Sequence, residues 1–239
     1  MPYIGENVTS SYATTSAPAC ANCTAHSGFL TSWRNTRDII TPHLASALAL
    51  HPDYRLELVG HSLGGAVALL AGLEFHSRGW APRITTFGEP RVGNAAFVKH
   101  VDEIFVGDRE ESDYRRVTRV DDPVPLLPLT EWGYCPHAGE VYISRSGLPP
   151  ELEDVQWCDG DEDARCSAGA DKSLMSKEVM AEVREEFGAE GLIPARYKIW
   201  QLFLAHRDYF WRLGVCMKEW EWKGWESFEG MGAEEVNEL

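Results

Sequence analysis

The apolar residues of this chain alternate between short continuous runs and longer segments with helical spacing. Apolar side chains recur at roughly helical spacing over residues 29–50, which predicts an amphipathic helix that Pro42 either kinks or divides. Further helices are predicted at residues 63–77, 95–106 and near 173–187, and strands at 55–59, 83–87, 114–120 and 141–144.

Strands and helices therefore alternate along the first two thirds of the chain. Such alternation predicts an α/β fold with a parallel sheet and helices on its faces. A chain of 239 residues is long enough for one domain with a sizeable core, and a second full domain is not expected. We divide the chain into an irregular N-terminal remnant (residues 1–27), an α/β domain (28–216) and an acidic, tryptophan-rich tail (217–239).

The charge balance narrows the choice of partners. The chain has 37 acidic and 22 basic residues, for a net charge of −15. This argues against a nucleic-acid partner, because phosphate contacts need clustered Lys and Arg.

No apolar run approaches the roughly 20 residues needed to span a bilayer. The first residues also lack the basic and apolar regions of a signal peptide.

The six cysteines indicate an oxidising compartment. Cys20 and Cys23 form a C-x-x-C with no second such pair, so no structural zinc site is expected. Short disulfide loops, Cys20–Cys23 and Cys158–Cys166, are the favoured interpretation. Glycosylation sequons begin at Asn7 and Asn22, and they also favour export, although no signal peptide is recognisable.

The richest chemical signal is the pentapeptide Gly60–Gly64, with the pattern Gly-x-Ser-x-Gly. It follows a strand and precedes a helix rich in small residues, which is the sequence form of a nucleophile elbow. We expect glycine to be required at both flanks, because side chains there would collide with the strand or the helix. Ser62 is the candidate nucleophile, and His61 is expected to pack beside it.

A serine nucleophile needs a base and a carboxylate that orients the base. In α/β-hydrolases the chain order is Ser, then Asp or Glu, then His. Asp121 and Asp122 both end the predicted strand 114–120, and only His137 and His206 follow them. The pattern alone chooses neither between the two aspartates nor between the two histidines.

Five blocks in the same order along the chain resemble the fungal class 3 lipases, a family that includes feruloyl esterase relatives. They are residues 59–66, 86–94, 116–128, 133–142 and 205–210. The resemblance runs from about Cys20 to Cys216. It implies an α/β-hydrolase fold, with a mostly parallel central sheet flanked by helices, for the domain at 28–216.

The resemblance also implies roles for individual residues. The acid of the family's Asp-x-Val-Pro motif corresponds to Asp122, and the histidine of its His-x-x-Tyr-Phe motif to His206, whereas His137 matches a position without a proton-transfer role. Ser62 would form an acyl-enzyme, and the Leu63 backbone N–H would give one arm of the oxyanion hole. The implied protein is a secreted, monomeric carboxylic ester hydrolase of triacylglycerol lipase type. It would act on ester or lipid substrates, including those at a lipid–water interface, without a metal or organic cofactor.

The chain departs from the family pattern in three respects. In the family a long segment with the first sheet strands, the second oxyanion donor and a helical lid precedes the C-x-x-C, so we expect an N-terminally truncated hydrolase. Cys216 matches a cysteine that pairs within that segment, and a Cys135–Cys216 bridge is left open. Arg207 stands where lipases often have an apolar residue. Two alternatives follow: a catalytically silent lipase-like domain, or an esterase for feruloyl or short-chain esters.

Overall fold

The structure is a computed structural model that describes residues 5–7, 20–107, 112–169 and 205–212. The predicted helix near 173–187, Cys216 and the tail at 217–239 lie outside these residues. The predicted α/β architecture is confirmed, because strands and helices alternate through the described part of the chain.

Five strands form the central sheet, in the order β3-β4-β5-β6-β7. They are β3 (Glu57–His61), β4 (Arg83–Phe87), β5 (Tyr114–Arg119), β6 (Glu140–Ile143) and β7 (Val155–Trp157). The first four are parallel, and β7 pairs antiparallel with β6. The sequence pattern missed β7, which has three half-buried residues and therefore no alternation to detect.

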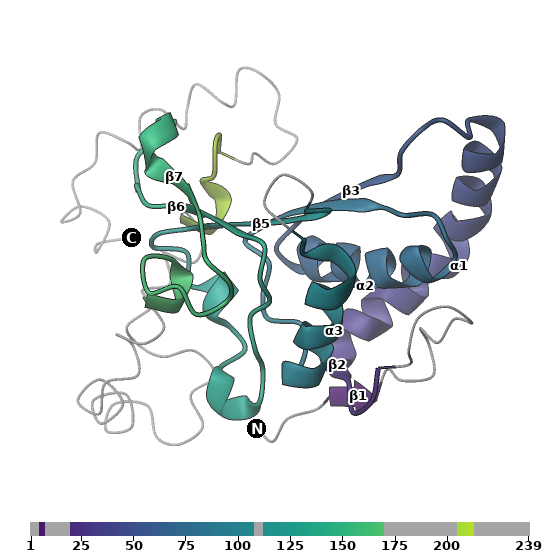
Figure 1. Cartoon of the computed structure of the whole chain (residues 1–239), viewed down its shortest axis with the longest axis horizontal. Coiled ribbons are helices and arrows are strands. Elements are labelled where there is room, and N and C mark those ends of the chain that lie inside the picture. The colour runs from purple at the N-terminus through teal and green to yellow at the C-terminus, as the bar shows by residue number, and fades with distance from the viewer. Residues whose placement is uncertain (1–4, 8–19, 108–111, 170–204, 213–239) are drawn as a thin grey trace, which may run out of the picture.

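Three helices lie on the same side of the strands in Figure 1. They are α1 (Ser27–Leu50), α2 (Leu63–Ser77) and α3 (Ala95–Phe105). Helix α1 neither ends nor divides at Pro42, which lies inside its 24 residues. Two short antiparallel strands, β1 (Gly5–Asn7) and β2 (Thr24–His26), precede it within the stretch expected to be irregular.

Short 3-10 turns lie between and after the later strands of the described chain. They are η1 (Val124–Leu126), η2 (Thr130–Trp132), η3 (Leu152–Asp154) and η4 (Ala205–Arg207). Both predicted disulfides, Cys20–Cys23 and Cys158–Cys166, are present. Cys135 forms no disulfide with any described residue.

Helix α2 lies at the centre of the fold and is buried over most of its length. It packs on the sheet beside β3 and β4 and against α1. Gly72 allows the close approach, since a Cβ there would lie 2.2 Å from Cδ1 of Ile84. Almost every position of α2 is apolar, which is typical of a helix surrounded by the rest of the core rather than facing water on one side.

One buried carboxylate links α1 to α2. The indole N–H of Trp33 donates to Oε2 of Glu74 over 2.9 Å, and Arg78 Nη2 lies 2.6 Å from Oε1. The Trp33 ring also meets the edge of Phe75, with centroids 5.4 Å apart. Glu74 is tolerated in the core because both of its oxygens have donors.

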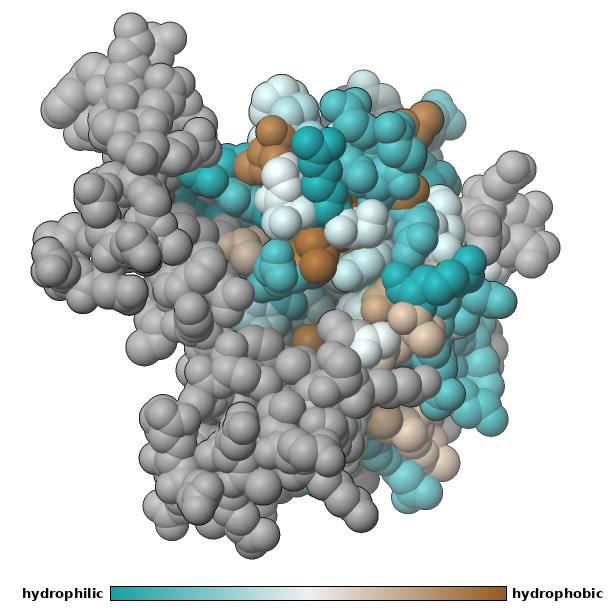
Figure 2. Space-filling model, turned by 90° about the vertical axis from the view of Figure 1, so that its left-hand side faces the viewer, coloured by the Kyte–Doolittle hydropathy of each residue, from teal (hydrophilic) through white to brown (hydrophobic). Residues whose placement is uncertain are grey.

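On the face shown in Figure 2, most of the described residues are hydrophilic. Figure 2 views the side on which β6 and β7 lie, where the hydrophobic residues among the described ones occur in small separate groups. Within the described part of the chain, no helix combines the length and the apolarity that a membrane span requires.

Replacement of Glu74 by alanine should lower the free energy of unfolding by about 1–3 kcal/mol, because the buried N–H of Trp33 would lose its acceptor. Urea unfolding followed by tryptophan fluorescence measures the change. Glu103→Ala is the matched control, since Glu103 is exposed on α3 and forms an i,i+4 pair with Lys99. It should change stability by no more than about 0.5 kcal/mol. Equal losses in the two variants would contradict this role for Glu74.

Candidate active site

Ser62 occupies a strained turn between β3 and α2. Its φ of 57° and ψ of −129° lie in a region that non-glycine residues rarely adopt, at a cost of about 1–3 kcal/mol. Its backbone N–H donates to the Phe87 carbonyl over 2.9 Å, which ties the turn to the end of β4. Strand β3 continues through Gly60 and His61, two residues beyond its predicted end, so the turn consists of Ser62 itself.

The two flanking glycines are not equivalent. A Cβ at Gly60 would lie 2.2 Å from the carbonyl oxygen of Gly64, which no side chain can tolerate. A Cβ at Gly64 would meet no described atom within 4 Å. The expectation that both flanks need glycine is therefore right for Gly60 and wrong for Gly64 within the described structure.

Asp122 follows β5 and is buried, whereas its neighbour Asp121 is exposed in the turn, with a φ of 67°. Oδ1 of Asp122 accepts from the Val124 N–H over 2.9 Å. Oδ2 accepts from the Tyr209 hydroxyl over 2.5 Å. These two donors leave the carboxylate facing the turn that carries His206, so the structure distinguishes the two aspartates by position.

His206 lies in η4, and its Nδ1 is 2.9 Å from Oδ2 of Asp122 and 3.1 Å from Oδ1. Because a carboxylate accepts, Nδ1 carries the hydrogen, and in the neutral imidazole Nε2 keeps its lone pair. Nε2 is buried and has no hydrogen-bond partner among the described residues. An imidazole held through Nδ1 with an unused, basic Nε2 is the arrangement that a general base requires.

Gly88 provides the space in which these groups meet. It follows β4 with a φ of +59°, and a Cβ there would lie 2.6 Å from the Tyr209 hydroxyl oxygen. The same Cβ would be 2.8 Å from Cε1 of His206 and 2.9 Å from Oδ2 of Asp122. The candidate site thus requires glycine at this position, a requirement that sequence reasoning missed.

Tyr209 was also missed as a site residue, although it lies three positions after His206 in the motif that identified the histidine. Its side chain is fully buried, and burial followed by the charge of Asp122 holds the pKa of its hydroxyl well above 10. Tyr209 therefore remains a hydrogen-bond donor to Asp122 throughout the pH range in which the protein can be studied.

A second set of bonds fixes the turn at residues 205–212. The Arg119 guanidinium donates to the Asp208 carbonyl over 2.5 Å and lies 3.8 Å from its carboxylate. Arg212 adds two bonds to the same carboxylate, at 2.7 and 2.9 Å. Burial lowers the pKa of Arg119, and the charge of Asp208 opposes that shift. The turn is thus fastened to the end of β5, beside Asp122.

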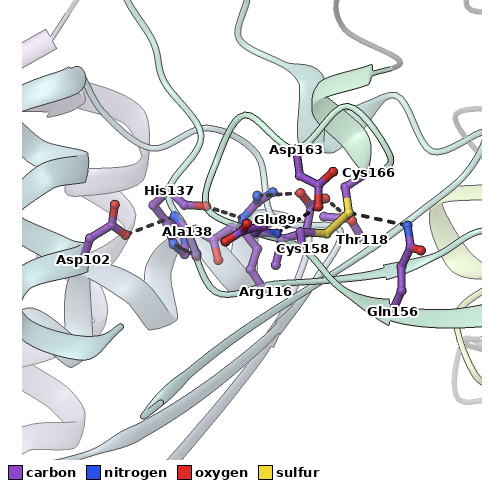
Figure 3. Close-up of polar contacts among 12 residues, drawn as sticks. Glu89, Asp102, Arg116, Thr118, His137, Ala138, Gln156, Cys158, Asp163 and Cys166 are labelled. Carbon is purple, nitrogen blue, oxygen red and sulfur yellow. Dashed lines mark hydrogen bonds and ion pairs between the residues drawn. A yellow bond between two sulfur atoms is a disulfide. The ribbon is translucent and has the colours of Figure 1, made fainter. Parts of the chain in front are cut away.

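His137, the other candidate base, belongs to a separate buried cluster shown in Figure 3. Its Nε2 lies 3.3 Å from Oε1 of Glu89, and its Nδ1 lies 2.8 Å from the Ala138 carbonyl. Both ring nitrogens face acceptors, so the ring can donate to both of them only as an imidazolium, which would pair with the Glu89 carboxylate. The Tyr114 hydroxyl donates to the other Glu89 oxygen over 2.6 Å. Within the described structure, then, His137 pairs with Glu89 and not with Asp122.

The pKa of Glu89 reflects this pairing. Complete burial alone would raise the pKa of Glu89, but the positive charge of His137 and hydrogen bonds from His137 and Tyr114 hold it below its ordinary value of 4.5. Glu89 follows Gly88 directly, so this cluster supports the loop that makes room for Asp122 and His206.

Only one group of described residues has the composition of a metal site. Glu140, Cys158 and Cys166 place ligand atoms within 4.8 Å of one another. Both sulfurs are joined in a disulfide, and Glu140 accepts from Thr118 and pairs with Arg116 at 3.3 Å. These partners already satisfy the three side chains, so the group does not fit a metal ion.

A serine on a strand–turn–helix elbow, beside a carboxylate–imidazole pair at the ends of parallel strands, defines the class of α/β-hydrolases. The model of the family described as Lipase (class 3) matches residues 4–132. The chain belongs to this family.

Individual relatives agree with this assignment. The secreted mono- and diacylglycerol lipase 2 of Gibberella zeae is 48% identical over 89% of this chain and 56% of its own length. The Lip2 lipase of Yarrowia lipolytica has a similar structure, with a TM-score of 0.71 and 31% identity over 91% of this chain and 67% of that chain. A fungal lipase structure described for an unusual buried polar cluster has a TM-score of 0.62 and 31% identity over 81% and 60% of the two chains. This chain spans about half the length of the curated relatives that it matches.

The Glu89–His137 pair predicts a change in the pH dependence of stability. In the wild type, the depressed pKa of Glu89 contributes stability that is present above pH 4.5 and is lost as the pH falls through the lower folded-state value. His137→Leu leaves a buried carboxylate without its cation, and should lower the free energy of unfolding at pH 7 by about 3–5 kcal/mol. Burial then raises the pKa of Glu89, so part of the loss should be recovered between pH 7 and pH 5.

Urea unfolding at a series of pH values measures this effect. His43→Leu is the control, because His43 is exposed on α1. A His137→Leu loss that does not diminish on acidification would show that Glu89 is not the carboxylate responsible.

Proposed function

We propose that this protein is a serine ester hydrolase in which Ser62, His206 and Asp122 form a catalytic triad. The observation that carries the proposal is the 2.9 Å contact of His206 Nδ1 with Asp122, which leaves a buried Nε2 that has no partner among the described residues. The His206 carbonyl also lies 2.6 Å from Nε2 of His61, the residue that precedes Ser62. Membership of the class 3 lipase family supports the same chemistry.

In this mechanism Ser62 Oγ attacks the carbonyl carbon of the ester, and His206 Nε2 takes the hydroxyl proton. The negative charge that develops on the carbonyl oxygen is stabilised by the Leu63 backbone N–H, at the first position of α2, where N–H groups lack intrahelical acceptors. Asp122 holds the imidazole in the tautomer that accepts at Nε2 and stabilises the imidazolium.

The tetrahedral intermediate then collapses with cleavage of the ester C–O bond. The proton on Nε2 passes to the leaving alkoxide, and Ser62 retains the acyl group. Water attacks the acyl-enzyme, with His206 again accepting a proton and returning it to Ser62. Each proton is transferred by the same nitrogen, so these steps require no metal or organic cofactor.

Acylglycerols are the substrates that we propose first, because a relative 48% identical to this chain is named as a mono- and diacylglycerol lipase. The word "secreted" in that name and the two disulfides of this chain support export as well, and we propose that the protein acts as a secreted monomer. A second candidate substrate is a soluble feruloyl or short-chain ester. It is favoured by half-buried Arg207, a cation directly beside His206.

Hydrolysis of p-nitrophenyl butyrate by the chain and its variants tests the triad. Ser62→Ala should reduce the rate to that of buffer, and Asp122→Asn should lower kcat by about 10⁴-fold, because the wrong imidazole tautomer is then favoured. Ser46→Ala is the matched control, since Ser46 is exposed on α1. If the folded wild type hydrolyses the ester no faster than Ser62→Ala does, the chain is a catalytically silent lipase-like domain.

The substrate class is tested with monoolein, diolein, triolein and ethyl ferulate at equal ester concentration. We expect the highest kcat/KM with the mono- and diacylglycerols. A preference for ethyl ferulate would contradict the first candidate and favour the second.

Gly88→Ala should lower kcat by at least about 100-fold, because the added methyl group would collide with Tyr209, His206 and Asp122 and displace the imidazole. Gly79→Ala is the matched control: its φ is also positive, at +79°, but a Cβ there meets no described atom within 4 Å. Ester hydrolysis and thermal unfolding of both variants measure the difference. Comparable activity in the two variants would contradict the geometry of the site.

A further inference from the structure

His61 makes a direct contact between the element that carries Ser62 and the element that carries His206. It is the last residue of β3 and immediately precedes Ser62. Its Nε2 lies 2.6 Å from the backbone carbonyl oxygen of His206. The two imidazole rings also face each other, with centroids 4.5 Å apart and planes inclined by 35°.

The atom that His61 contacts determines which of its ring nitrogens carries a hydrogen. A carbonyl oxygen can only accept, so Nε2 of His61 carries the hydrogen and donates. Burial is the largest effect on the pKa of His61 and lowers it. The hydrogen bond to the His206 carbonyl and the charge of Asp122 raise this pKa, whereas the charges of the His206 ring and of Arg207 lower it. The Tyr209 ring also lies near His61 in an edge-to-face arrangement, with centroids 6.1 Å apart. His61 is therefore a neutral Nε2–H donor at neutral pH.

We propose that His61 is a positioning residue, which holds the backbone of the catalytic base at a fixed distance from the nucleophile. This inference rests on the proposed function and adds a residue to it. Asp122 fixes the Nδ1 edge of the His206 ring, and Arg119 holds the carbonyl of Asp208, two residues further on. Neither bond reaches the peptide of His206 itself, and η4 is only a three-residue turn. The His61 bond acts on the peptide of His206 instead, from a strand residue covalently joined to Ser62.

The neutral state of His61 also suits the reaction. When His206 takes the proton of Ser62, an imidazolium forms against the His61 ring. A positive charge on His61 would oppose that step, because like charges at this distance disfavour protonation. A neutral donor holds the base without this penalty.

Two substitutions distinguish the effect of the His61 hydrogen-bond donor from the effect of its side-chain volume. His61→Gln places an amide N–H near the former position of Nε2, whereas His61→Leu fills much of the volume without a donor. We expect His61→Leu to lower kcat for p-nitrophenyl butyrate by about tenfold, with KM within about twofold of the wild type. His61→Gln should keep kcat within about threefold. His51→Leu is the control, because His51 is exposed and stacks on Tyr54.

Backbone hydrogen exchange supplies a readout that does not need activity. Amides of residues 205–212 should exchange several-fold faster in His61→Leu than in the wild type or His61→Gln, while those of α2 stay unchanged. The inference would be overturned if His61→Leu changed neither kcat nor the exchange of these amides. It would also be overturned if kcat of His61→Gln were as low as that of His61→Leu, or if the substitutions changed KM alone. Failure of the proposed function is seen separately, as wild-type hydrolysis equal to that of Ser62→Ala.

Discussion

The carboxylate of Asp122 is the interaction on which the candidate site depends. It is a buried charge at the end of β5, and it accepts from a backbone N–H, the Tyr209 hydroxyl and His206 Nδ1. Three donors compensate for the loss of water around this group, as a buried carboxylate requires. The same three bonds orient it, so the interactions that make the charge tolerable also aim it at the imidazole. A site with fewer donors would be both less stable and less well directed.

Two other buried carboxylates, Glu74 and Glu89, follow the same rule with different partners. Glu74 accepts from Trp33 and pairs with Arg78, and Glu89 lies between Tyr114 and His137. Glu89 adjoins Gly88, whose empty side-chain position is where Asp122, His206 and Tyr209 converge. The polar cluster beneath the site is thus part of its support: it anchors the loop that must carry no side chain at residue 88.

The sequence was sufficient for the parts of the structure that depend on local pattern. The parallel sheet and the burial of α2 follow from runs of apolar residues, and the turn at Ser62 follows from its motif. Pattern could not separate Asp121 from Asp122, or His137 from His206, because the contacts that distinguish them join residues 84 and 48 positions apart. Family resemblance selected the same pair that the structure brings together, Asp122 and His206. The requirement for glycine at residue 88 arises only from the meeting of three distant side chains, which no local signal encodes.

His206 lies in a three-residue turn, which has no regular hydrogen-bond ladder to hold its position. Here long-range bonds replace that ladder. Asp122 binds the His206 ring, and His61 binds the His206 carbonyl. Arg119 binds the carbonyl of Asp208, two residues further along the chain. The three anchors come from the ends of β5 and β3, so the sheet itself sets the distance between base and nucleophile. Contacts from the ends of a rigid sheet can in this way fix the position of a turn far along the chain, provided that each contact reaches a different atom of the turn.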